Sequence, residues 1–208
     1  KLLKVKFIFN KSTADPYNLT GNIYYQIKSM EHGLSVIPEN YFVFKSRSDL
    51  FINRKALKKI LNLDYTIESK SILENKIWIP YFEVTKIFYI GDECFYGKAS
   101  DLQKFISYEQ IYDNIGIDAG ISHIRRFANP YAKIDPEIIN LLIKFGNCSF
   151  GPDRFKVLEE RLEDISYLKY LSKYYQIIKS DFRVGLEGES NYIDFRMWSS
   201  GTIHPTSN

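Results

Sequence analysis

Residues 77–90, IWIPYFEVTKIFYI, give the strongest strand signal in the chain. The run is dominated by β-branched and aromatic residues, which favour a pleated backbone. Pro80 interrupts it and predicts an edge or a bend, because proline cannot donate a hydrogen bond to a sheet. The turn Gly91-Asp92-Glu93 then leads into a short return strand at 94–96. The stretch therefore predicts a β-hairpin.

Strands and helices are predicted on both sides of this hairpin. Alternation of apolar and polar residues predicts strands at 3–9, 22–28 and 40–45. Helices are expected at 49–62 and 101–114, with Ser48 and Ser100 as their N-caps, and after the pair Asp135-Pro136. The longest helix is expected at about 153–179, with one side lined by Leu158, Leu162, Ile165, Leu168, Leu171, Tyr175 and Ile178. Strands at 182–184 and 192–198 are expected to form a closing β-hairpin.

This order of elements indicates an α+β fold with a mainly antiparallel sheet. The chain has 208 residues, enough for one well-buried domain, and its 45% apolar and 25% charged residues are typical of globular proteins. We expect a single domain over 1–208, with a basic part at 1–60, a helix-rich part at 100–180 and a terminal hairpin at 182–198. No apolar run reaches the roughly 18 residues that span a membrane, so no membrane partner is expected.

The cysteine and histidine content argues against a zinc centre. Cys94 and Cys148 lie far apart, and the three histidines are scattered, so no ligand spacing typical of zinc sites is present. Two cysteines also do not make a disulfide framework. A reducing, cytoplasmic setting is therefore the expectation.

The net charge of +3 conceals a strong asymmetry. Residues 1–60 contain 11 Lys or Arg against 4 Asp or Glu, and the rest of the chain is slightly acidic. This imbalance indicates an anionic partner, although surface lysines also serve solubility. Within the helix predicted at 49–62, the basic residues fill one arc, which is either a phosphate-binding face or a solvated one. A second basic stretch, HIRRF at 123–127, combines cations with an aromatic ring, as nucleic-acid stacking surfaces do. The candidate nucleic-acid-binding residues are Lys45, Arg47, Arg54, Lys55, Lys58, Lys59, Arg125 and Arg126.

Candidate catalytic residues lie in the stretch DPYNLTGNIYYQIK at 15–28. Asp15, followed by Gln26 and Lys28, resembles the variant form of the PD-(D/E)xK signature of metal-dependent nucleases, in which glutamine replaces an acid. The resemblance covers 15–28 only, and Pro16 follows the aspartate instead of preceding it. It implies that Asp15 binds Mg²⁺ and that Gln26 and Lys28 project from one face of a strand toward the scissile phosphate. Glu31, Glu39 and Glu83 are alternatives for a further metal ligand.

Two classes of function follow. The first is a DNA-binding protein, in its narrower form a Mg²⁺-dependent endonuclease that hydrolyses phosphodiesters. The second is a non-enzymatic interaction module, such as an immunity, viral or accessory subunit, with a protein partner or a second copy of the chain. The high aromatic content, 16 Tyr and 15 Phe, favours the second class, because aromatic residues often anchor interfaces. A transferase acting on glycans or nucleotides is a third class, for which the sequence has no motif.

Overall fold

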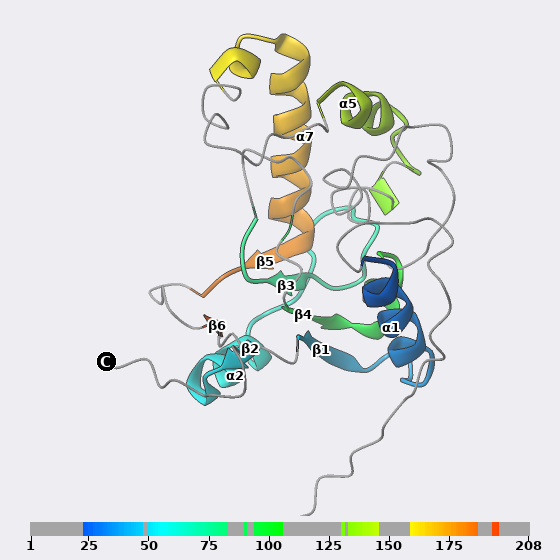
Figure 1. Ribbon diagram of the computed structural model, residues 1–208, viewed down its shortest axis with the longest axis vertical. Helices are drawn as coiled ribbons and strands as arrows, with labels where there is room; N and C mark the ends of the chain where they lie inside the picture. The colour runs from blue at the N-terminus through cyan, green and yellow to red at the C-terminus, as the bar shows by residue number, and fades with distance from the viewer. Residues whose placement is uncertain are drawn as a thin grey trace, which may run out of the picture.

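The computed structural model describes residues 23–47, 50–82, 90, 94–105, 130–131, 133–145, 159–186 and 193–195. Its elements are α1 (Ile23–Ser35), β1 (Phe42–Ser46), β2 (Leu50–Ile52), α2 (Arg54–Leu61), β3 (Ile77–Ile79), β4 (Cys94–Lys98), α3 (Ala99–Gln103), α5 (Glu137–Phe145), α7 (Ile165–Asp181), β5 (Phe182–Val184) and β6 (Ile193–Phe195). The C-terminal end of helix α7 lies against a small sheet (Figure 1). Helix α5 lies beside the N-terminal half of α7, and α2 lies beyond the sheet, at the bottom of the view. The chain has an α+β fold, as predicted.

The main sheet has four strands in the order β1-β4-β3-β5 and is mostly antiparallel. Strands β3 and β4 pair in antiparallel register, with Trp78 opposite Tyr96, as a hairpin requires. The predicted bounds of that hairpin are wrong: β3 covers only Ile77–Ile79, and Ile90, expected at the end of the outgoing strand, lies on the returning arm opposite Phe82. Strand β5 is parallel to β3, with Ile77 opposite Phe182, although more than 100 residues separate them. The parallel pairing therefore joins β5, which follows directly after α7, to β3.

The strand predicted at 22–28 is wrong, because the backbone there belongs to helix α1. Ile27, Met30 and Leu34 recur at spacings of three and four, which is the helical period. That period becomes visible only in a window longer than 22–28. Leu34 is buried in the main core, and Met30 packs against it.

The two strands predicted at the end of the chain are present, but they do not pair with each other. Strand β5 joins the main sheet, whereas β6 pairs antiparallel with β2, with Leu50 opposite Phe195. Residues 50–52 were expected in a helix, and this pairing holds them extended instead. Helix α2 consequently begins at Arg54, with Asn53 as its N-cap in place of Ser48.

Other boundaries differ less. The strand expected at 40–45 is β1, and the helix expected after Asp135-Pro136 is α5, with the Asp135 side chain accepting the backbone N–H of Glu137 at 3.1 Å. Helix α3 begins at Ala99 and lacks a side-chain cap, so Ser100 does not act as its N-cap. The strand expected at 3–9 lies outside the described residues, as does 106–129.

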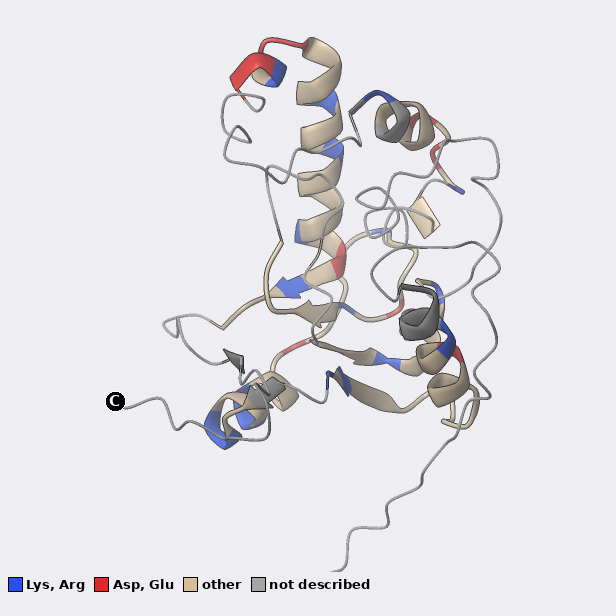
Figure 2. Cartoon of the chain, in the orientation of Figure 1, with Lys and Arg blue, Asp and Glu red and all other residues tan. Residues whose placement is uncertain are grey.

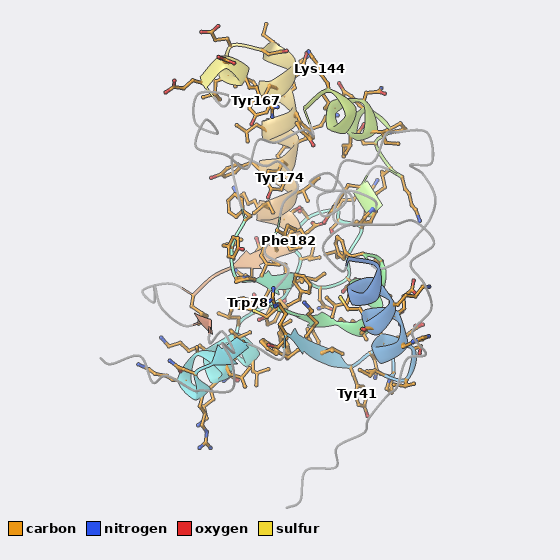
Figure 3. All side chains as sticks on the ribbon, viewed as in Figure 1. Tyr41, Trp78, Lys144, Tyr167, Tyr174 and Phe182 are labelled. Carbon is orange, nitrogen blue, oxygen red and sulfur yellow. The ribbon has the colours of Figure 1, made fainter. Side chains whose placement is uncertain are left out.

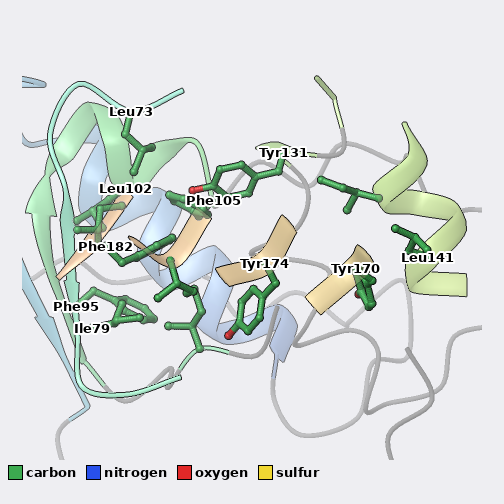
Figure 4. Close-up of a cluster of buried hydrophobic side chains, with 14 of the residues drawn as sticks. Leu73, Ile79, Phe95, Leu102, Phe105, Tyr131, Leu141, Tyr170, Tyr174 and Phe182 are labelled. Carbon is green, nitrogen blue, oxygen red and sulfur yellow. The ribbon is translucent and has the colours of Figure 1, made fainter. Parts of the chain in front are cut away.

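Helix α7 packs through tyrosines. Tyr167, Tyr170, Tyr174 and Ile178 recur at helical spacing, and all four are buried. Along the helix, the labelled Tyr167 and Tyr174 lead down to Phe182 and Trp78 at the sheet (Figure 3). The core continues without a break from Phe95 and Ile79 on the sheet to Leu141 of α5 (Figure 4). The leucine side of the predicted helix is mostly on the outside instead: Leu162, Ile165, Leu168 and Tyr175 are exposed.

The long helix begins at Ile165 rather than near 153, because Asp164 caps it. The Asp164 side chain accepts the backbone N–H of Ser166 at 2.7 Å and the ammonium of Lys144 at 2.8 Å, so it also links α5 to α7. These contacts lower the pKa of the Asp164 carboxyl, the Lys144 hydrogen bond having the largest effect and the Ser166 N–H the next.

This cap predicts a pH-dependent contribution to stability. A carboxyl whose pKa is lowered by folding stabilises the folded state above its ordinary pKa of 3.8. The stabilisation is lost as the pH falls through the folded value. Asparagine caps a helix about as well, so Asp164→Asn removes the charge alone. We expect wild type to melt about 1–3 °C above this variant at pH 6. In circular dichroism melts the gap should close as the pH approaches 2, and a gap that widens on acidification would contradict this account.

Candidate nucleic-acid interface

Helix α2 presents a row of lysines because its other side is anchored in the core. Asn53 fixes the start of the helix by accepting the backbone N–H groups of Lys55 and Ala56 at 2.8 and 2.9 Å. Ala56 and Ile60 are fully buried. Lys55, Lys58 and Lys59 of the same helix are exposed to solvent. Figure 2 shows the basic residues of α2 in blue. Lysines in the last turn also suit the negative end of the helix dipole.

A second set of cationic residues lies at the junction of α7 with β5, beside α2. Lys179 lies in the last turn of α7, and Arg183 is the middle residue of β5. The parallel pairing of β5 with β3 brings Lys76, the residue before β3, to the same place. Its ammonium donates to the main-chain oxygen of Lys179 at 3.3 Å. Two lysines and one arginine from two distant segments thus meet beside α2.

The wall opposite α2 is held by a turn after β5. Gly185 has a positive φ of 62°, a conformation that glycine adopts without strain. Its N–H donates to the carbonyl of Ile79 at 2.9 Å, and its carbonyl accepts the indole N–H of Trp78 at 2.9 Å. Trp78 itself is fully buried. These bonds fix the backbone that carries Arg183 against the sheet.

Between these elements lies a groove of about 610 Å³, which we call the basic groove. Its lining residues are Lys55, Lys58, Lys59, Asn62, Leu63, Lys76, Lys179, Phe182, Arg183, Val184, Gly185 and Leu186. Six of these side chains are cationic, and none of the twelve is acidic. In Figure 2 the basic residues of α2 and β5 lie on the same side of the molecule.

One carboxylate lies close to the groove without lining it. Asp64 forms an ion pair with Arg183 at 3.8 Å, and its carbonyl accepts the Arg183 Nε–H at 2.7 Å. The pKa of Asp64 is lowered, chiefly by the backbone N–H of Thr66 and to a smaller extent by the charges of Arg183 and Lys76. Asp64 therefore orients the guanidinium from one side. Within the described residues, Lys55, Lys58 and Lys179 have no ion pair.

The predicted nucleic-acid-binding residues are divided by the fold. Lys55, Lys58 and Lys59 line the basic groove, whereas Arg54, Lys45 and Arg47 do not. The Lys45 ammonium lies over the ring of Phe95, 5.0 Å from its centroid. Arg125 and Arg126 lie outside the described residues.

The predicted catalytic set does not acquire the geometry that the nuclease resemblance implies. Asp15 and the side chain of Gln26 lie outside what the structure describes. The backbone of 26–28 is helical, so positions 26 and 28 are about 200° apart around the axis instead of sharing a strand face. Lys28 forms an ion pair with Glu31 at 2.7 Å. Among the residues described, no group of three His, Cys, Asp or Glu side chains could hold a metal ion.

Three of the six cationic residues of the basic groove were not predicted from the sequence. Lys76 and Lys179 are isolated lysines near the start of β3 and the end of α7, and Arg183 is the middle residue of β5, so none of the three belongs to a basic cluster in the sequence. Only the pairing of β3 with β5 brings them together.

Comparisons of the chain with family models, with curated proteins and with solved structures each find no match. None of the described helices combines the length and the apolar character needed to cross a membrane. The interpretation of the groove therefore rests on its own chemistry.

Proposed function

We propose that this protein binds nucleic acid through its phosphates, in the basic groove between α2 and β5. The observation that carries this proposal is the composition of the groove, which has six cationic side chains and no acidic one among its lining residues. Phosphate contacts by Lys and Arg supply most of the sequence-independent affinity of nucleic-acid-binding proteins.

The electrostatics of the groove support binding of a polyanion rather than internal charge pairing. Lys55 and Lys58 are exposed and make no ion pair within the described part of the chain, so their charges are available to a ligand. Burial of Ala56 and Ile60 fixes the helix that carries them. A rigid row of lysines facing Lys179 and Arg183 offers phosphates contacts on both walls.

Salt dependence of DNA binding tests this proposal. Each phosphate neutralised contributes about −0.9 to the slope of log K against log salt concentration for duplex DNA. If four to six of the groove cations contact phosphates, we expect a slope of about −4 to −5, measured by fluorescence anisotropy between 50 and 300 mM salt. Failure to bind at 50 mM, or an affinity that does not change with salt, would overturn the proposal.

Mg²⁺-dependent endonuclease activity is the narrower form of this proposal. It rests on Asp15 with Gln26 and Lys28, on the sequence resemblance alone, and a magnesium ion would supply an activated water there. DNA cleavage that requires Mg²⁺, stops with EDTA and is lost in Lys28→Ala would support it. The cytoplasmic setting is likewise a proposal, in keeping with the free, buried thiol of Cys94.

A protein partner is the second candidate, and exposed apolar residues on α7 and just before it favour that candidate. Leu162, Ile165, Leu168 and Tyr175 are exposed by 42%, 71%, 44% and 53%. Exposed apolar residues of this kind are suited to packing against another chain. If a second copy covers it, sedimentation should show a dimer in wild type and a monomer in Ile165→Glu. A monomer in both, at concentrations up to 100 µM or so, would argue against self-association.

A further inference from the structure

A second hollow adjoins the basic groove and shares three of its cations. It has a volume of about 1000 Å³, and Lys76, Lys179 and Arg183 line both spaces. Its own lining is mixed, with apolar contributions from Ile72, Ile138 and Ile177 and polar ones from Ser69, Gln176 and Ser180. The further charged residues of the lining are Glu68, Lys70, Asp135, Lys173 and Asp181. A hollow of this size, lined by both apolar and polar side chains, has room for a small organic ligand. We call this space, lined by Lys76, Tyr131 and Asp181 among others, the nucleotide hollow.

Two buried charged residues line this hollow, and neither is ion-paired within the described residues. Lys76 is only 8% exposed, and its ammonium has the single long hydrogen bond to the Lys179 carbonyl. Asp181 is 2% exposed, and its two oxygens accept the hydroxyls of Ser180 at 2.6 Å and Tyr131 at 2.8 Å. Burial of a charge without an opposite partner is costly. A ligand that offers an anion to Lys76 and N–H donors to Asp181 would relieve both costs.

The Asp181 carboxylate can accept further hydrogen bonds besides the one from the Tyr131 hydroxyl. Burial, followed by the charge of Asp181, raises the pKa of Tyr131 well above its ordinary value, so the phenol stays protonated and donates. A carboxylate has about four lone-pair positions, and the hydroxyls of Ser180 and Tyr131 use two of them. Asp181 can thus receive the N–H groups on the Watson–Crick edge of a base.

We propose that the nucleotide hollow holds one unpaired nucleotide of a single strand, with its phosphate at Lys76 and its base edge at Asp181. This inference rests on the proposed function, because the phosphates on either side of that nucleotide would continue along the basic groove. The base has to be unpaired, since in a duplex its Watson–Crick edge is occupied by the opposite strand. The ligand class is therefore single-stranded nucleic acid, or a duplex with an overhang.

Anisotropy titrations with three labelled DNAs test this inference. We expect a 12-nucleotide single strand and a duplex with a four-nucleotide overhang to bind at least tenfold more tightly than a blunt 12-base-pair duplex at equal salt. Asp181→Asn replaces an acceptor oxygen with an N–H₂ donor at nearly constant volume, and both neighbouring hydroxyls can rotate to accept. This variant should lower the single-strand preference at least fivefold and leave blunt-duplex affinity within twofold of wild type. Equal affinity of wild type for all three DNAs would overturn the inference while leaving the proposed function intact.

Competition experiments on wild type keep the inference testable if Asp181→Asn does not fold. We expect dGMP, which carries a phosphate and two adjacent N–H donors, to displace the single strand, and guanosine and inorganic phosphate to displace it far less. If phosphate competes as well as dGMP, the site recognises an anion only and the hollow holds no base. If no DNA binds in a salt-dependent way, the proposed function fails, and this inference fails with it.

Discussion

Asp101→Ala is expected to lower the free energy of unfolding by about 3–5 kcal/mol, the range for removing one partner of a buried ionic network. Asp101 is fully buried. Its carboxylate accepts the backbone N–H groups of Glu74 and Asn75, each at 2.9 Å, and the ammonium of Lys104 at 2.9 Å. Alanine would leave two N–H groups and one ammonium without this acceptor, and buried donors that lose their partner bear the full cost of desolvation.

The loss of stability in Asp101→Ala is expected to be large because Asp101 joins two segments of the fold. Its bonds join α3 to the segment just before β3, across 26 and 27 residues of chain. Lys104 strengthens the same junction by donating to the carbonyl of Ile72 at 2.8 Å. The segment that it holds leads directly into Lys76 and β3, so the network also supports one wall of the basic groove.

Urea denaturation followed by circular dichroism measures this effect. Asp101→Asn keeps one acceptor oxygen and should lose clearly less stability than the alanine variant. Glu160→Ala, on an exposed position, serves as a control and should change stability by no more than about 0.5 kcal/mol. A loss below 1 kcal/mol for Asp101→Ala would mean that the network is replaced by water or by rearrangement.

Substitution of both Lys55 and Lys58 by glutamine is expected to weaken DNA binding by about ten- to a hundredfold at 0.1 M salt. Each lost phosphate contact should reduce the salt slope by close to one unit, so the double variant should lose about two. Folding should be unaffected, since both side chains are exposed and neither has a hydrogen bond or an ion pair in the described structure.

A matched control separates local contact from net charge. Lys133→Gln with Lys169→Gln removes the same two charges from exposed positions that line neither the basic groove nor the nucleotide hollow. This variant should retain nearly the wild-type salt slope. If both double variants weaken binding equally, attraction is a matter of overall charge and the groove is not the binding surface.

Local sequence signals were sufficient for several elements. The apolar run at 77–90 and the strand after it predict an antiparallel pairing of β3 with β4, because a hairpin is formed by neighbours in sequence. The turn predicted at 91–93 is wrong, because Ile90 already pairs back with Phe82. Asp135 followed by proline predicts the start of α5, since a cap acts within one helical turn. The basic arc at 54–59 predicts an exposed lysine face, and the structure shows that face on α2.

The secondary-structure predictions were wrong mainly where a contact with a distant part of the chain determines the local conformation. Residues 50–52 are extended because they pair with β6, about 140 positions later. The buried side of α7 is the tyrosine side, because that side faces the sheet and α5, which the amphipathic pattern of one helix cannot reveal. The short window at 22–28 satisfied the strand period by coincidence, and only Met30 and Leu34 beyond it disclose the helix.

The sequence by itself determined the α+β class, the antiparallel pairing of the two central strands and the concentration of positive charge in the first 60 residues, since these follow from composition and from contacts between near neighbours. Only the tertiary structure decided where that charge is used. Lys76, Lys179 and Arg183 join the lysines of α2 because β5 pairs in parallel with β3, a contact over more than 100 residues. Strand pairing and burial over such distances are selected by the free energy of the whole fold, so no local stretch of sequence encodes the groove.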